Sequence, residues 1–523
     1  MHQWLYSLLC VATAGVALPI VAAIPQPVHT ASGPVSGVPG ADGTVLSFKG
    51  IPYAAPPIGD LRWRAPGPPA SWTSVRNADQ FSSSCIQIIQ EEHKPWTHEF
   101  LAHNRVSEDC LYLNVWTPAR TVSDKLPVYF WIYGGGFVAG SSAVPVYDGE
   151  NLARRGVVVV TINYRVGVLG FLAHPDLTRE AGWSGNYGSL DQLAALQWVQ
   201  KNIAVFGGDP GNVTISGQSA GANSVHNLVA SPLAKGLFQR AIAESGSSYA
   251  LATPPTPMLA AAEAAGVRFA TAKGAASLKA LRAMSPETLM AKLSNGPAPA
   301  FRPVIDRYFL TADPQEIYAE GKQNDVPELT GMNRDEKSAA ADYGDIPMAA
   351  FETSAREHYL DLASRYFELY PNSTQAQSGE SQKAAYRDAG LVSMYLWAAQ
   401  RAKTATSKAF TYYWTHPEPG PDSARFGAFH SSEVPYVFNT LNQSSRPWTD
   451  QDRKIADLLG SYWLNFMRTG DPNGKDLPPW PAVPSKSAIT MELGDRFGPR
   501  AVADAGKLAF WEQYVLRPNA VLQ

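Results

Sequence analysis

Short apolar runs bounded by glycine are the feature that most constrains the fold of this chain. Residues 128–133 are apolar or aromatic and are followed by three glycines, and residues 157–162 form a second run of valine, threonine and isoleucine. Such runs suit strands that are buried on both faces. Shorter runs continue the pattern at residues 213–216, 241–244, 326–330 and 410–414, and residues 190–203 carry apolar side chains at helical spacing. Strands alternating with helices predict an α/β protein built on a mainly parallel sheet.

The chain shows no clean boundary between domains. No long linker, charge block or repeat divides its 523 residues, so residues 24–523 are predicted to form a single domain. Residues 255–320 and 345–405 are rich in alanine, leucine and methionine and favour helices. We expect these two segments to cover a site rather than to build the sheet.

The N-terminus has the pattern of a targeting segment. Residues 4–23 are apolar and uncharged, and Val21-Ala22-Ala23 offers small side chains for cleavage. This predicts a signal peptide over residues 1–23 and a secreted or periplasmic protein. The segment before the apolar run has His2 but no lysine or arginine, which leaves an uncleaved membrane anchor as the alternative. No other stretch approaches about 18 uncharged apolar residues, so no membrane insertion of the mature chain is expected.

The cysteine content and the net charge further restrict the classes of protein to which this chain can belong. Cys85 and Cys110 remain if Cys10 leaves with the signal peptide. In an oxidising compartment they are expected to pair, and two separate buried thiols are the alternative. The formal net charge is −3, so the chain has no excess of basic residues with which to bind nucleic acid. Three cysteines also exclude a cysteine-rich zinc protein, and no metal or organic cofactor is expected.

A serine at a strand-to-helix turn is the candidate nucleophile. Gly217-Gln-Ser-Ala-Gly221 follows the apolar run at 213–216 and precedes an Ala/Val/Leu-rich segment at 222–230. The Gly-x-Ser-x-Gly elbow requires this context, because the sharp turn exposes the serine hydroxyl above the sheet. The start of the following helix also favours the negative charge that develops during attack. We therefore predict that Ser219 is a nucleophile.

A serine hydroxyl needs a base, and the base needs an acid that orients it. His430 lies in a loop before an apolar segment and is the preferred base, with His416 as a competitor. His358 falls in a predicted helix and fits a surface position better. Asp335 and Glu336 both follow the strand predicted at 326–330, where catalytic groups of open α/β sheets gather. The residue pattern does not choose between these two acids.

A glycine-rich loop provides the third requirement, donors for an oxyanion. Residues 134–137 (Gly-Gly-Gly-Phe) follow a buried strand. Their backbone N–H groups, with that of Ala220, could hold a tetrahedral intermediate. The alternative is a turn that serves packing alone.

Four long motifs in order give the chain a family resemblance. They are residues 48–63, 108–118, 163–171 and 206–221. With them, nearly the whole mature chain resembles the type B carboxylesterase/cholinesterase family of α/β-hydrolases. The resemblance implies a large, mostly parallel central sheet flanked by helices, with helical insertions over an active-site gorge.

The resemblance also assigns roles to individual residues. It places the acid on Glu336 rather than Asp335 and the base on His430. It implies oxyanion donors at Gly135, Gly136 and Ala220. It further matches Cys85 and Cys110 to the first disulfide of the family.

Two positions bear on the substrate. Many relatives carry glutamate before the nucleophile, whereas this chain has Gln218. The change removes a negative charge, so a cation such as choline is less favoured. Trp96 lies between the two cysteines and could stack on an acyl or alcohol group, with ordinary packing as the alternative.

These observations predict a secreted serine carboxylesterase that acts on small-molecule esters through an acyl-enzyme. The alternatives on the same machinery are a hydrolase of feruloyl- or tannin-type aromatic esters, of carbamates or of xenobiotic esters, and a lipase. A non-catalytic binding protein is a remote alternative, because Ser219, Glu336 and His430 are all present.

Overall fold

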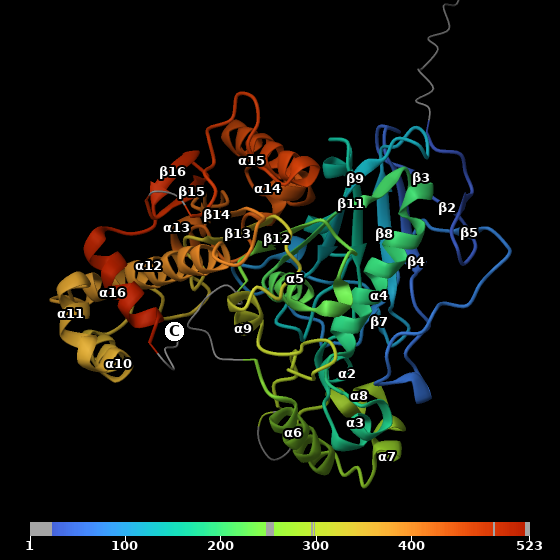
Figure 1. Cartoon of the computed structure of the whole chain (residues 1–523), viewed down its shortest axis with the longest axis horizontal. Helices are drawn as coiled ribbons and strands as arrows, with labels where there is room; N and C mark the ends of the chain where they lie inside the picture. The colour runs from blue at the N-terminus through green and yellow to red at the C-terminus, as the bar shows by residue number, and fades with distance from the viewer. Residues whose placement is uncertain (1–22, 247–255, 294–296, 298, 485–486, 518–523) are drawn as a thin grey trace, which may run out of the picture.

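A central sheet of eleven strands organises the part of the chain that the computed structural model describes, residues 23–246, 256–293, 297, 299–484 and 487–517. The sheet runs from β16 at one side of Figure 1 to β3 at the other. In spatial order its strands are β16 (Gly498–Ala501), β15 (Ile489–Leu493), β14 (Ala409–Trp414), β13 (Glu328–Asn333), β12 (Arg240–Glu244), β11 (Gly208–Gln218), β9 (Leu126–Ile132), β10 (Val158–Ile162), β8 (Tyr112–Thr117), β4 (Leu46–Pro52) and β3 (Val38–Pro39).

The seven adjacent strands from β15 to β10 are parallel to one another, and antiparallel strands complete both edges. The predicted mainly parallel sheet is therefore confirmed. All side chains from Val128 to Ile132 and from Val158 to Ile162 are inaccessible to solvent, as expected of strands covered on both faces. The expected signal peptide, apart from Ala23, lies outside the described residues.

Two smaller sheets flank the N-terminal half. The strands β1 (Val28–His29), β2 (Pro34–Ser36) and β5 (Arg76–Asn77) form one of them, and β6 (Ser84–Cys85) pairs with β7 (Val106–Ser107) in the other. Cys85 forms a disulfide with Cys110, so the two cysteines are not separate thiols. The bond closes the segment from 85 to 110 into a loop.

Helices cover the sheet and extend beyond it (Figure 1). The first eight are α1 (Glu150–Ala153), α2 (Gly167–Phe171), α3 (Pro175–Ala181), α4 (Tyr187–Asn202), α5 (Ala220–Ala230), α6 (Leu259–Ala272), α7 (Leu278–Arg282) and α8 (Pro286–Met290). The remainder are α9 (Pro314–Ala319), α10 (Met348–Tyr359), α11 (Ala363–Leu369), α12 (Gln375–Arg401), α13 (Ser423–Phe426), α14 (Val434–Phe438), α15 (Asp450–Thr469) and α16 (Ala505–Val515).

The two predicted helical segments occupy separate ends of the molecule. In Figure 1, α6, α7 and α8 lie near α3, and Glu263 of α6 accepts a hydrogen bond from Thr178 of α3 at 2.5 Å. Helices α10, α11, α12 and α16 form the other end, where α16 packs on α11 and α12. Among the described residues, no helix is both long enough and apolar enough to cross a membrane.

Candidate active site

Ser219 occupies the sharp turn between β11 and α5. Its backbone has φ 59° and ψ −122°, a strained conformation for a residue with a side chain. Its N–H donates to the carbonyl oxygen of Glu244 at 2.8 Å, which ties the turn to the neighbouring strand. A Cβ atom on Gly221 would lie 2.0 Å from the carbonyl oxygen of Ile132. Glycine is therefore required for α5 to pack this closely on β9.

His430 lies in the loop before α14 and contacts both Glu336 and Gln218. Its Nδ1 forms a hydrogen bond with Oε2 of Glu336, and its Nε2 is 3.2 Å from Nε2 of Gln218. Because the Gln218 amide nitrogen donates, Nε2 of His430 accepts and Nδ1 carries the ring proton. In this tautomer Nε2 is an acceptor, as a general base requires, and the Gln218 amide occupies it in this structure.

Charged neighbours set the proton affinity of this imidazole. Burial opposes protonation of His430, but the adjacent Glu336 carboxylate, with a smaller contribution from Glu433, outweighs burial. Lys337 acts in the opposite direction. The net result is that the pKa of His430 lies above its ordinary value.

The competing histidines lie elsewhere. His416 is held between two carboxylates, with Nδ1 2.6 Å from Asp495 and Nε2 2.9 Å from Asp452. His358 is on α10, and its Nε2 is 2.6 Å from the hydroxyl of Tyr514 on α16. Of these three histidines, His430 shares the cavity with Ser219.

The two candidate acids point to different partners. Glu336 contacts His430, and its other oxygen accepts the backbone N–H of Asn333 at 2.7 Å. Asp335 is paired instead with Arg334 at 2.8 Å and Arg387 at 2.6 Å. Asp335 therefore anchors its turn to α12, while Glu336 faces the imidazole.

The glycine-rich loop after β9 lies against the elbow. Gly135 has φ 109° and Gly136 has φ 63°, and a Cβ on Gly135 would be 2.2 Å from the carbonyl oxygen of Ala139. Both glycines line the same cavity as Ser219. Ala220 begins α5, so its N–H has no acceptor within the helix.

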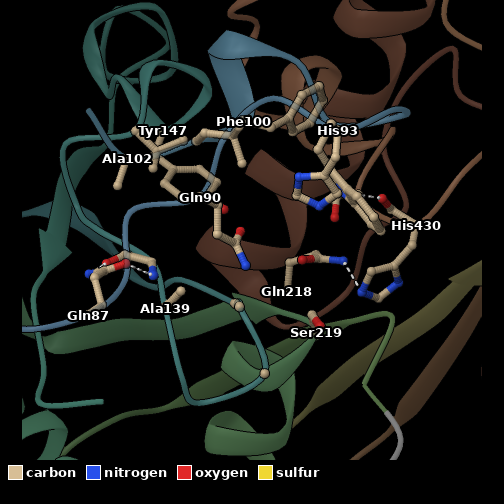
Figure 2. A pocket seen from close by; sticks show the side chains of 18 residues that line it. Gln87, Gln90, His93, Phe100, Ala102, Ala139, Tyr147, Gln218, Ser219 and His430 are labelled. Carbon is tan, nitrogen blue, oxygen red and sulfur yellow. Dashed lines mark hydrogen bonds between the residues drawn. The ribbon is translucent and has the colours of Figure 1, made fainter. Parts of the chain in front are cut away.

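A cavity of about 270 Å³ opens above Ser219 (Figure 2). Its described lining residues include neither a carboxylate nor a lysine or arginine. They are Gln87, Gln90, His93, Trp96, Phe100, Leu101, Ala102, Gly134, Gly135, Gly136, Ala139, Gly140, Val144, Tyr147, Gln218, Ser219, His430 and Ser431.

The wall of this cavity is not built from the two helical segments that were expected to cover the site. None of the described lining residues comes from 255–320 or 345–405; residues 87–102 of the disulfide-closed loop contribute instead. Gln87 explains how that loop is held, since its amide group donates to the carbonyl oxygen of Gly140 at 2.7 Å and accepts the N–H of Gly140 at 2.8 Å. Sequence reasoning missed Gln87, whose only signal is its place two residues after Cys85.

Trp96 is the member of that loop that touches the histidine. Its indole N–H donates to the carbonyl oxygen of His430 at 3.1 Å. The two rings meet edge to face with centroids 6.4 Å apart. Trp96 thus both lines the cavity and packs against the histidine loop.

A mostly parallel sheet that carries a strained serine at a strand-to-helix turn, beside a cavity, defines an α/β-hydrolase. The chain belongs to the carboxylesterase family, whose model matches residues 25–511. This confirms the family resemblance of the sequence motifs. Membership of this family, together with relatives that are named esterases, shows that the protein is a carboxylic ester hydrolase.

Three relatives illustrate the match. The chain is 37% identical to fumonisin B1 esterase of Sphingopyxis macrogoltabida, over 92% of this chain and 89% of that protein. It is 36% identical to para-nitrobenzyl esterase of Bacillus subtilis (strain 168), over 90% of this chain and 94% of that protein. It is 34% identical to cholinesterase of Mus musculus, over 89% of this chain and 83% of that protein.

Proposed function

We propose that the protein is a secreted serine carboxylesterase in which Ser219, His430 and Glu336 form the catalytic triad. The observation that carries the proposal is the arrangement of His430: it shares a cavity with the strained Ser219, and its Nδ1 bonds to Glu336. Gly135, Gly136 and Ala220 are the proposed oxyanion donors. The tautomer of His430 supports the role of general base.

The reaction follows from these roles. Ser219 Oγ attacks the ester carbonyl while Nε2 of His430 takes the hydroxyl proton, and backbone N–H groups bind the oxyanion that forms. Collapse breaks the bond to the alcohol, which leaves with the proton from His430, and an acyl-enzyme remains. Water then attacks the acyl-enzyme with His430 again as base, which releases the acid and restores Ser219.

The residues that line the cavity support the proposal that the substrates are uncharged carboxylic esters. Aromatic rings and glutamine amides line it, and its described lining lacks a carboxylate that would attract a cation. Gln218 in place of glutamate acts in the same direction. The relatives include proteins named for fumonisin B1 and para-nitrobenzyl esters as well as a cholinesterase, so it is the cavity lining and Gln218 that disfavour a choline substrate.

Export is part of the proposal. The Cys85–Cys110 disulfide suits an oxidising compartment. The N-terminal apolar segment supplies the expected signal peptide.

Covalent labelling tests the proposed nucleophile. A serine-directed organophosphate should add one label per chain, at Ser219, because only an activated serine hydroxyl reacts stoichiometrically. Intact-mass measurement and peptide mapping would locate the label, with hydrolysis of p-nitrophenyl esters from acetate to palmitate measured on the same sample. Equal labelling of wild type and Ser219→Ala would overturn the assignment.

The acid limb of the pH–rate profile should lie above the ordinary histidine pKa of about 6.5. The raised pKa of His430 means that the imidazole stays protonated, and unable to act as base, to a higher pH. The rate should thus fall as pH drops through this raised value. We expect kcat/KM for p-nitrophenyl butyrate to show this limb. A flat profile into strongly acidic pH would contradict the role of His430.

A further inference from the structure

Asn333 connects the turn that carries Glu336 to the loop that carries His430. It is the last residue of β13 and its side chain is fully buried. Its backbone N–H donates to Oε1 of Glu336 at 2.7 Å. Its side-chain amide donates to the carbonyl oxygen of Phe429 at 2.7 Å and to Oε2 of Glu433 at 2.5 Å.

Both acceptors lie beside His430 in the sequence. Phe429 directly precedes His430, and Glu433 follows it by three residues. A further contact joins the same two segments, since the N–H of Asp335 donates to the carbonyl oxygen of Ala428 at 3.0 Å. One buried side chain therefore fixes the histidine loop on both sides of the imidazole, while the same residue's backbone orients the acid.

We propose that Asn333 is a positioning residue of the triad, which holds Glu336 and His430 in register and donates a hydrogen bond to the carboxyl group of Glu433 beside them. This inference rests on the proposed triad. Asn333 does not line the cavity, so it acts through the two triad members and not on the substrate.

The Asn333 side chain should also change the pKa values of Glu433 and His430, each in a definite direction. Burial raises the pKa of Glu433, and the carboxylate of Glu336 raises it further, whereas the Asn333 amide lowers it. Ionised Glu433 raises the pKa of His430, together with Glu336 and against Lys337. Glu244 on β12 and Glu418 are further carboxyl groups that interact with Glu433. The pKa of Glu433 is already raised to about 7. Losing the Asn333 amide should raise it further, reduce the negative charge beside the imidazole and so lower the pKa of His430.

Asn333→Leu tests both parts at once. It removes the side-chain donor without adding charge and keeps the backbone N–H. A displacement of the imidazole by about 1 Å costs about 100-fold in rate, so kcat should fall by about that factor with KM little changed. The acid limb of kcat/KM for p-nitrophenyl butyrate should also move to lower pH. Asn333→Ser, a smaller change, should give the same direction with a smaller loss, and it carries the test if the leucine variant does not fold.

Two comparisons separate positioning from general destabilisation. Glu433→Gln removes the charge but leaves an acceptor for Asn333, so it should shift the acid limb to lower pH with a much smaller loss of kcat. Asn114 is an equally buried asparagine, 1% exposed, whose amide donates to Ser142 and Thr161 at 3.0 Å each. Asn114→Leu should lower thermal stability but leave both kcat and the acid limb of the folded enzyme unchanged.

The outcomes distinguish a failure of the Asn333 proposal from a failure of the proposed triad. If Ser219→Ala is inactive and the folded Asn333 variants keep the wild-type kcat and acid limb, Asn333 has no positioning role. A loss of kcat in Asn114→Leu equal to that in Asn333→Leu would also reject the proposal. If Ser219→Ala stays active, the proposed triad fails first.

Discussion

Replacing Ser219 and His430 together with alanine should lower kcat no further than replacing either residue alone, by about 10⁶-fold in each case. In the proposed triad the two residues act as one unit, since a serine hydroxyl without a base is a poor nucleophile and a base without the hydroxyl has no proton to take. The residual rate would come from binding and from the backbone donors near Gly135 and Gly136. The measurement is kcat for p-nitrophenyl butyrate on the two single variants and the double variant.

The other histidines provide the controls. His416→Gln removes two contacts with carboxylates, at Asp452 and Asp495, and should affect stability rather than kcat. His358→Gln changes a contact between α10 and α16 that lies away from the cavity, and it should leave kcat unchanged. Losses that multiply in the Ser219/His430 double variant would show two independent contributions and reject the proposed unit.

The sheet and the elbow were predictable because their signals are local. Continuous apolar runs mark β9 and β10, whose side chains are buried on both faces. The boundaries were less predictable: β11 begins at Gly208, five residues before the apolar run, because backbone pairing with β9 extends past the apolar side chains. The antiparallel strand β4 was missed, since its sequence Leu-Ser-Phe-Lys-Gly-Ile-Pro mixes polar and apolar residues next to the edge strand β3.

The arrangement of the site was harder to predict from residue patterns, because it depends on contacts with distant parts of the chain. Asp335 and Glu336 are adjacent in sequence, and their different orientations depend on Arg387 of α12, some fifty residues away. Only the family resemblance separated them. The cavity wall from Gln87 to Ala102 has no period that a pattern could detect, and its position depends on hydrogen bonds between Gln87 and Gly140.

Glu336→Gln should lower kcat by about 10⁴-fold with little change in KM. In the proposed mechanism the Glu336 carboxylate accepts the Nδ1 proton of His430 and stabilises the imidazolium that forms during attack. A glutamine amide can instead donate to Nδ1, which moves the ring proton to Nε2 and removes the lone pair that must face Ser219. The kcat of this variant for p-nitrophenyl butyrate, with the organophosphate labelling rate of Ser219 beside it, measures the loss.

Asp335→Asn is the matched control, because it makes the same carboxylate-to-amide change one residue away. Asp335 is buried and paired with Arg334 and Arg387. Its neutralisation should lower the free energy of unfolding by about 2 kcal/mol, between the values for buried and for exposed pairs. Its kcat should fall far less than that of Glu336→Gln, since its carboxylate does not contact the imidazole. Equal losses of kcat in the two variants would mean that Glu336 acts through the stability of its turn rather than through His430.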